Sequence, residues 1–129
     1  MESSLKTDKK VNSIDVVACV KILEECVSFE HIQDRAYIKK TLMLLDGPIK
    51  VIPEEISAEL KTFVNEEINP ILSDLHYFDF LQDEQYGDYD SNGKFRIKSE
   101  AALDEIIAAL YRHTLVLNLK LFRKISKYI

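Results

Sequence analysis

Apolar residues recur every three or four positions along most of this chain, which is the spacing of α-helices with one buried face. The first helix is expected to follow Asn12 or Ser13, because either side chain can cap a helix N-terminus. Its buried face should consist of Val16, Val17, Val20, Leu23 and Val27.

A second helix is expected to start between Phe29 and Asp34 and to run to Leu45. Its inward positions are Ile38, Leu42 and Leu45. The helix should end at Gly47, which suits the left-handed cap conformation, and the proline that follows cannot continue it.

Pro53 and the two glutamates after it predict the start of a third helix, since proline fits the first turn and acids favour its positive end. The expected inward positions are Ile56, Leu60, Phe63, Val64 and Ile68. Pro70 disfavours helix at the residue before it. We therefore expect a fourth helix from Pro70 to about Gln82, with Ile71, Leu75 and Phe78 inward; one continuous helix kinked at the proline is the alternative.

The segment from Tyr86 to Lys98 is the least helical part of the chain. The dipeptide Asn92-Gly93 is a strong turn signal and could close a hairpin between residues 86–90 and 95–98. The pairing is unattractive, because it would place two aspartates on the same face as Phe95 and Ile97. We expect an irregular or hairpin excursion near residues 86–98.

A long last helix is expected after Ser99, which can cap it. Its helical stripe consists of Leu103, Ile106, Leu110, Thr114, Leu117 and Leu121. Leucines also alternate strictly from Leu115 to Leu121, which fits a strand, but the helical stripe continues in phase and no turn residue intervenes. Leu115, Leu119 and Phe122 widen the apolar surface, so this helix is either contacted from two sides or forms an interface between copies of the chain.

These elements predict a mostly α fold, a compact bundle of about five helices. The alternative is an α+β fold, which requires strands at both 95–98 and 115–122. The 129 residues fit one domain, with residues 1–12 as a flexible N-terminal tail and residues 13–129 as a single helical domain.

The sequence predicts a cytoplasmic protein. The polar, lysine-rich start lacks the apolar core of a signal peptide, and no apolar stretch has the length of a membrane helix. Cys19 and Cys26 would lie about 10 Å apart along a shared helix, too far for a disulfide. Both adjoin aliphatic residues, so we expect buried thiols in a reducing compartment.

Charge is distributed unevenly along the chain. Residues 1–61 carry a net charge of −2, residues 62–93 have eight acids and no Lys or Arg, and residues 94–129 carry +5. Tyrosines lie among these acids, and clustered carboxylates with tyrosine suit the binding of a basic protein. The candidate partner-binding residues are Asp79, Asp83, Glu84, Tyr86, Asp88, Tyr89 and Asp90. The alternative is a solvated acidic face, balanced in part by the basic C-terminal helix.

Residues 88–95 resemble the first half of an EF-hand calcium loop. The resemblance rests on Asp88, Asp90, Asn92, Gly93 and Phe95, which match loop positions 1, 3, 5, 6 and 8. It implies a calcium site with Asp88, Asp90 and Asn92 as ligands. Position 12, where the family has a bidentate glutamate, is serine in this chain, and the plain alternative is a turn closed by an aspartate side chain.

No complete catalytic motif is present, so the chain is expected not to be an enzyme and to need no cofactor. The sequence pI near 5.2 makes nucleic acid an unlikely partner. The leading hypothesis is a non-enzymatic protein-binding module, such as a small inhibitor or immunity protein that masks a basic nuclease toxin. The alternatives are a calcium-responsive module and a structural homo-oligomer paired through its C-terminal helix.

Overall fold

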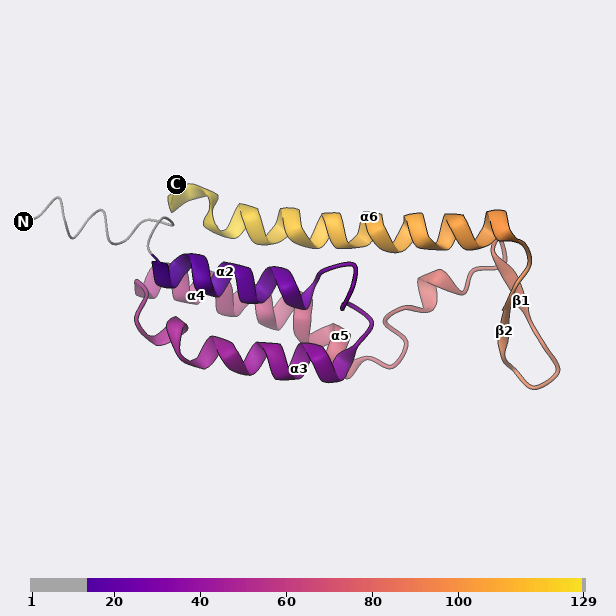
Figure 1. Ribbon diagram of the computed structural model, residues 1–129, viewed down its shortest axis with the longest axis horizontal. Helices are drawn as coiled ribbons and strands as arrows, with labels where there is room; N and C mark the ends of the chain where they lie inside the picture. Colours follow the sequence, from indigo (N-terminus) through magenta and orange to yellow (C-terminus); the bar gives the residue numbers. More distant parts are fainter. Residues whose placement is uncertain (1–13, 129) are drawn as a thin grey trace, which may run out of the picture.

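The computed structural model describes residues 14–128 and shows a mostly helical chain with one β-hairpin, as the sequence predicts. The elements are α2 (Ile14–Cys26), α3 (Arg35–Met43), α4 (Glu54–Phe63), α5 (Asn69–Ser73), β1 (Gly87–Tyr89), β2 (Phe95–Ile97) and α6 (Glu100–Ile125). Helices α2 to α5 lie together as a bundle, and α6 runs along the bundle and beyond its end to the hairpin (Figure 1). The predicted tail 1–12 and the caps Asn12 and Ser13 lie outside the described residues.

Helix α2 buries one face, whose members are spaced by three or four residues: Val16, Cys19, Leu23 and Cys26. Val17, which was expected on this face, is partly exposed. The two thiols are free and buried, as predicted. Burial, assisted by a neighbouring carboxylate, raises the pKa of each to about 11, so both stay protonated at neutral pH.

Helix α3 begins where Asp34 accepts a hydrogen bond from the Tyr37 N–H at 3.0 Å, the N-cap interaction that aspartate favours. Ile38 and Leu45 are buried as predicted and Leu42 is partly buried against the core, but α3 ends at Met43 and not at Leu45 as expected. The predicted left-handed cap is wrong, because Gly47 has a φ of −73°. The chain instead passes through two short 3-10 turns at this point, and the second carries Ile49 into the core.

Helices α4 and α5 form one continuous run, joined by a π-helical turn at Val64–Ile68. The predicted alternative of a continuous helix is therefore correct. Proline at position 70 has no N–H to donate to a helical hydrogen bond. In the π turn just before it, each N–H bonds to the carbonyl five residues earlier, so the Asn69 N–H donates to the Val64 carbonyl. The buried residues of this run are Ile56, Ser57, Leu60, Phe63, Ile68 and Ile71.

The predicted extension of the fourth helix to Gln82 is wrong, because α5 ends at Ser73. The Arg35 guanidinium donates hydrogen bonds to the carbonyls of Ile71 at 2.8 Å and Asp74 at 2.9 Å, and so satisfies acceptors at this helix end. The Asp74 carboxylate in turn accepts from the N–H two residues later. Leu75, which was expected inward, is 81% exposed as a result.

The hairpin pairs Asp88 with Arg96 and Tyr89 with Phe95 in antiparallel register. The expected clash of carboxylates with apolar residues is wrong, because it assumed a register one residue away. The turn is one residue longer, with the Asp90 N–H bonded to the Lys94 carbonyl and a left-handed glycine before Lys94. A shift of one residue moves every side chain to the other face, so Asp88 lies opposite an arginine.

Helix α6 is capped by Ser99, whose hydroxyl accepts from the Ala102 N–H at 3.1 Å. Its buried row consists of Leu110, Thr114, Leu117, Leu121 and Ile125. Residues 115–122 are helical, so the strand interpretation and the α+β alternative are wrong. Leu103 was expected in the core but is exposed, since the first turns of α6 extend beyond the bundle (Figure 1).

The buried row of α6 predicts a contrast between two leucines. Leu117→Ala should lower the free energy of unfolding by about 2–5 kcal/mol, because it opens a cavity in the core. Leu119→Ala, at a position about half exposed, should change it by less than about 1 kcal/mol in dilute solution. Urea unfolding at low protein concentration measures both, and equal losses would contradict this assignment of faces.

A second prediction concerns the hairpin. A Cβ on Gly87 would overlap the backbone carbonyl of Arg96 across the strand pair. Gly87→Ala should therefore disrupt the pairing of β1 with β2 and leave the helices folded. Amide hydrogen exchange should show faster exchange at the strand amides and unchanged protection in α2 and α4. Asp88→Ala, on the exposed side of β1, is the matched control.

Candidate functional site

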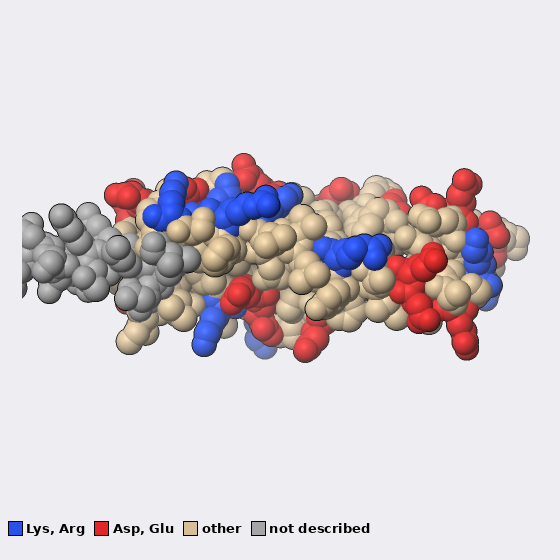
Figure 2. Space-filling model, turned by 90° about the horizontal axis from the view of Figure 1, so that it is seen from above, with Lys and Arg blue, Asp and Glu red and all other residues tan. Residues whose placement is uncertain are grey.

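The acidic residues singled out in the sequence gather at one end of the molecule. Asp83 and Glu84 lie in the loop before β1, and Asp88 lies within β1. All three are exposed, and we call them the acidic end. Acidic side chains cluster at the hairpin end of the face shown in Figure 2. The structure thus brings carboxylates of a loop and a strand to the same end of the molecule, where basic side chains of β2 and its flanks are also exposed.

The two remaining candidate carboxylates have partners within the chain. Asp79 lies 3.0 Å from His76 Nδ1, and Asp90 lies 3.1 Å from Arg96 Nε. Within residues 14–128, the three members of the acidic end form no ion pair. Their charge is therefore exposed to solvent and available to another molecule.

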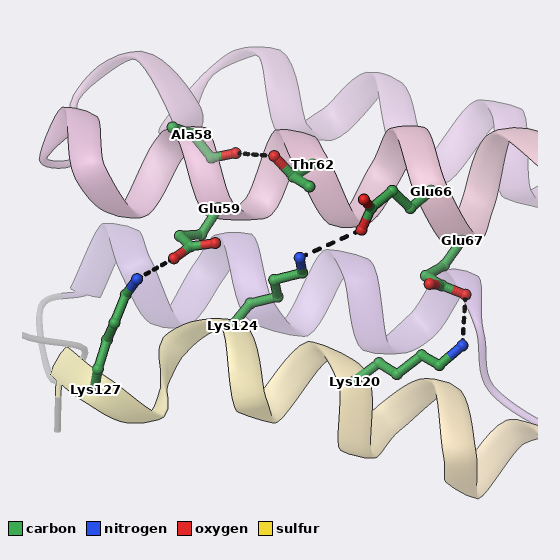
Figure 3. A network of polar contacts seen from close by, with 8 residues as sticks. All are labelled: Ala58, Glu59, Thr62, Glu66, Glu67, Lys120, Lys124 and Lys127. Carbon is green, nitrogen blue, oxygen red and sulfur yellow. Dashed lines mark hydrogen bonds and ion pairs between the residues drawn. The ribbon is translucent and has the colours of Figure 1, made fainter.

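The lysines of the C-terminal helix are occupied elsewhere. Lys120 lies 3.3 Å from Glu67, Lys124 lies 3.3 Å from Glu66, and Lys127 pairs with Glu59 (Figure 3). We call these three pairs the lysine ladder. The hydrogen bond from Lys127 lowers the pKa of the Glu59 carboxyl. The sequence analysis gives the basic C-terminal helix as a partial balance for the acidic stretch. Lys120 and Lys124 balance the start of that stretch, in the π turn, whereas Lys127 pairs with an acid that precedes it; none of the three pairs with the acidic end.

The two candidate tyrosines differ in position. Tyr86 is only 8% exposed and presents little surface to a partner. Tyr89 is 59% exposed, donates a hydrogen bond to Gln82 Oε1 at 3.1 Å and packs edge-on against Phe95. Phe80 is also exposed, at 43%, and was not selected from the sequence, where its position among acids was the one available signal. The aromatic part of the surface is therefore Tyr89 and Phe80.

The segment that leads to the acidic end is attached to α6 through an aromatic cluster. Tyr77 Oη and His113 Nε2 are 2.7 Å apart, and both Tyr77 and Phe80 pack against the His113 ring. Burial lowers the pKa of His113 and raises the pKa of Tyr77, so both are neutral at pH 7. Sequence spacing gives His113 no partner, because Tyr77 lies 36 residues away.

The half-loop that resembles an EF-hand is folded as the turn of the hairpin. The Asp90 carboxylate accepts hydrogen bonds from the N–H groups of Asn92 and Lys94, each at 2.9 Å, and from Arg96. These bonds, the one from Lys94 most, lower its pKa. Asp88 lies in a strand, and residues 14–128 contain no group of three or more His, Cys, Asp or Glu that could hold a metal ion. The arrangement thus offers no observation in favour of calcium over a plain turn.

The protein is mostly helical, and the exposed carboxylates of the acidic end lie at the end of the molecule that carries the β-hairpin. No protein-family model, curated protein or solved structure matches the chain. Within the described part of the chain, no helix combines the length and the apolar character needed to cross a membrane. Function is therefore inferred from the geometry of the exposed surfaces.

The Tyr77–His113 contact predicts a dependence of stability on pH. The pKa of His113 is lower in the folded state, so the unfolded chain takes up its proton first as the pH falls below about 6.5. The contribution of neutral His113 to the free energy of unfolding should be fully present above that pH. As the pH falls, this contribution should decrease until the pH is below the pKa of His113 in the folded state. Lys120 and Glu67 are the charged groups that act on this ring, with opposite signs.

Urea unfolding at pH 8 and pH 5 tests this expectation. His113→Gln, which keeps a hydrogen-bonding group at the position without titrating, should lose less stability between the two pH values than the wild type. An unchanged dependence in His113→Gln would contradict the role of this contact.

Proposed function

We propose that this protein is a non-enzymatic protein-binding module that engages a basic partner protein through its acidic end. The observation that carries the proposal is the separation of charge. Asp83, Glu84 and Asp88 have no ion pair within the described residues, whereas three lysines of the C-terminal segment are paired with other acids in the lysine ladder and Arg96 of the hairpin is paired with Asp90. Such a surface can neutralise cations on another molecule without first breaking internal pairs.

Electrostatic attraction would act mainly on the rate of association. Like-signed charges clustered on one surface attract an oppositely charged protein and orient it before contact. The exposed ring of Tyr89, in the same strand as Asp88, supplies apolar area beside those charges, and the exposed ring of Phe80 lies in the segment that leads to them. Tyrosine is enriched among residues that dominate binding energy, so we expect Tyr89 to slow dissociation.

The partner class that fits best is a basic protein whose own surface binds nucleic acid. A small acidic inhibitor or immunity protein that masks a nuclease toxin would have this size and charge. The buried thiols Cys19 and Cys26 suit a reducing compartment, which supports a cytoplasmic site of action.

A paired-bait experiment tests the proposal. Wild-type protein and Asp83→Asn/Glu84→Gln/Asp88→Asn are used to capture proteins from the source cells at low salt. The control Glu24→Gln/Glu30→Gln/Asp46→Asn removes three exposed acids elsewhere and changes the net charge equally. A basic protein retained by wild type and control, and lost with the acidic-end variant, supports the proposal.

The rates of association and dissociation with the purified partner provide a further test. The acidic-end variant should associate roughly 10-fold more slowly at low salt, and the difference should shrink as salt rises. Dissociation should change little, whereas Tyr89→Ala should accelerate it. Equal association rates for the acidic-end and control variants would overturn the proposed binding surface.

A further inference from the structure

A second surface, distinct from the acidic end, runs along α6. Six large apolar side chains of α6 are between 45% and 54% exposed. Val116 lies apart from the others around the helix, and the remaining five are Ile107, Tyr111, Leu115, Leu119 and Phe122. Their spacing of four, four, four and three residues keeps them on one side of the helix, and we call them the apolar stripe. Phe29, itself 40% exposed, extends the stripe by packing edge-on against Tyr111.

The stripe lies on the flank of α6 opposite the lysine ladder. At 3.6 residues per turn, the centre of the stripe is roughly a quarter turn from the buried row, and the ladder lysines are roughly a quarter turn away in the other direction. One flank of this C-terminal segment is therefore held by ion pairs to α4 and to the π turn that follows α4, and the other flank is apolar and open. Seen from above, uncharged surface covers much of the length of the molecule, interrupted by Lys or Arg side chains near its middle and by charges at both ends (Figure 2).

The charges beside the stripe are arranged by sign. Glu100, Asp104 and Glu105 are exposed in the first turns of α6, whereas Arg112 and Arg123 are exposed further along. Within residues 14–128, neither arginine forms an ion pair. Glu105, Arg112 and Arg123 are separated by seven and eleven residues, which places all three along the same edge of the stripe.

We propose that the apolar stripe is an interface with a second copy of this chain, with the two α6 helices antiparallel. A second copy supplies both an apolar stripe and charges of the required sign. Parallel helices would bring the acidic starts together and the arginines together, which costs binding energy. Antiparallel helices place the acidic start of each beside the basic part of the other.

The register follows from the midpoint of the stripe. Ile107 and Phe122 mark its ends, so a two-fold axis falls near Thr114. Glu105 and Arg123 each lie nine residues from that position, on the same edge. The axis therefore brings Glu105 of one copy to Arg123 of the other, and the same pair forms a second time across the axis.

The available area fits a specific but modest dimer. Three of the six side chains are aromatic, with about 150–250 Å² each when fully exposed, and the three aliphatic ones are smaller, so the six half-exposed side chains offer at most on the order of 600 Å² per copy. The total, at most on the order of 1,200 Å², lies at the lower end of the range for specific interfaces. Association should therefore be concentration-dependent.

Sedimentation equilibrium of the wild-type chain between micromolar and submillimolar concentration tests the dimer. The mass should rise from 14.9 kDa toward twice that value. Leu115→Glu, which puts two carboxylates near the axis, should keep the mass at 14.9 kDa with unchanged helical circular dichroism. Leu75→Glu alters an exposed leucine outside the stripe and should associate like the wild type. A monomeric wild type, or an unaffected Leu115→Glu, would overturn the interface.

Charge reversal tests the antiparallel register. Glu105→Arg and Arg123→Glu should each weaken the dimer by roughly 10-fold or more, because each creates two like-charged contacts. The double variant should return to within roughly 3-fold of the wild type. Additive losses in the double variant would overturn the register. The acidic-end variant should dimerise normally, so this result is independent of the proposed binding function.

Discussion

The structure depends on the packing of the buried row of α6 against α2 and α4. Leu117 and Leu121 are almost completely buried in this contact. Thr114 is buried with them, and its hydroxyl donates to the Tyr111 carbonyl at 2.7 Å, so the row contains no unsatisfied polar group. Once this row is inside, helical geometry determines what the other faces of α6 meet. The lysines reach α4 and the π turn after it, and the apolar stripe is left outside.

The length of α6 has a second consequence. The helix is longer than the bundle, so its first turns carry the hairpin away from the other helices (Figure 1). The Tyr77–His113 contact attaches the preceding segment to the same helix. The acidic end is thereby held at a distance from the lysine ladder, and the charge asymmetry of the sequence becomes an asymmetry along the molecule.

Periodicity predicted the helices well, because each helix has one buried face and helical spacing records it directly. Three features were beyond such reasoning. The end of α5 depends on Arg35, which reaches it from another helix. The hairpin register depends on a turn one residue longer than the dipeptide Asn92-Gly93 suggests. The partner of His113 lies on a distant segment. For the candidate site, the acids were found in the sequence, but the burial of Tyr86 and the exposure of Phe80 follow from the tertiary fold.

The alternating leucines of α6 link the fold to the proposed interface. In a helix, residues two apart point roughly 200° away from each other, so strict alternation produces two apolar faces. Leu117 and Leu121 occupy the buried face, whereas Leu115 and Leu119 are about half exposed on the other side. The alternation that resembles a strand in the sequence is thus a helix with two separate apolar faces. The bundle covers the face that carries Leu117 and Leu121. A helix that packs on one face only usually has polar residues on its other faces, whereas this helix has leucine at positions 115 and 119.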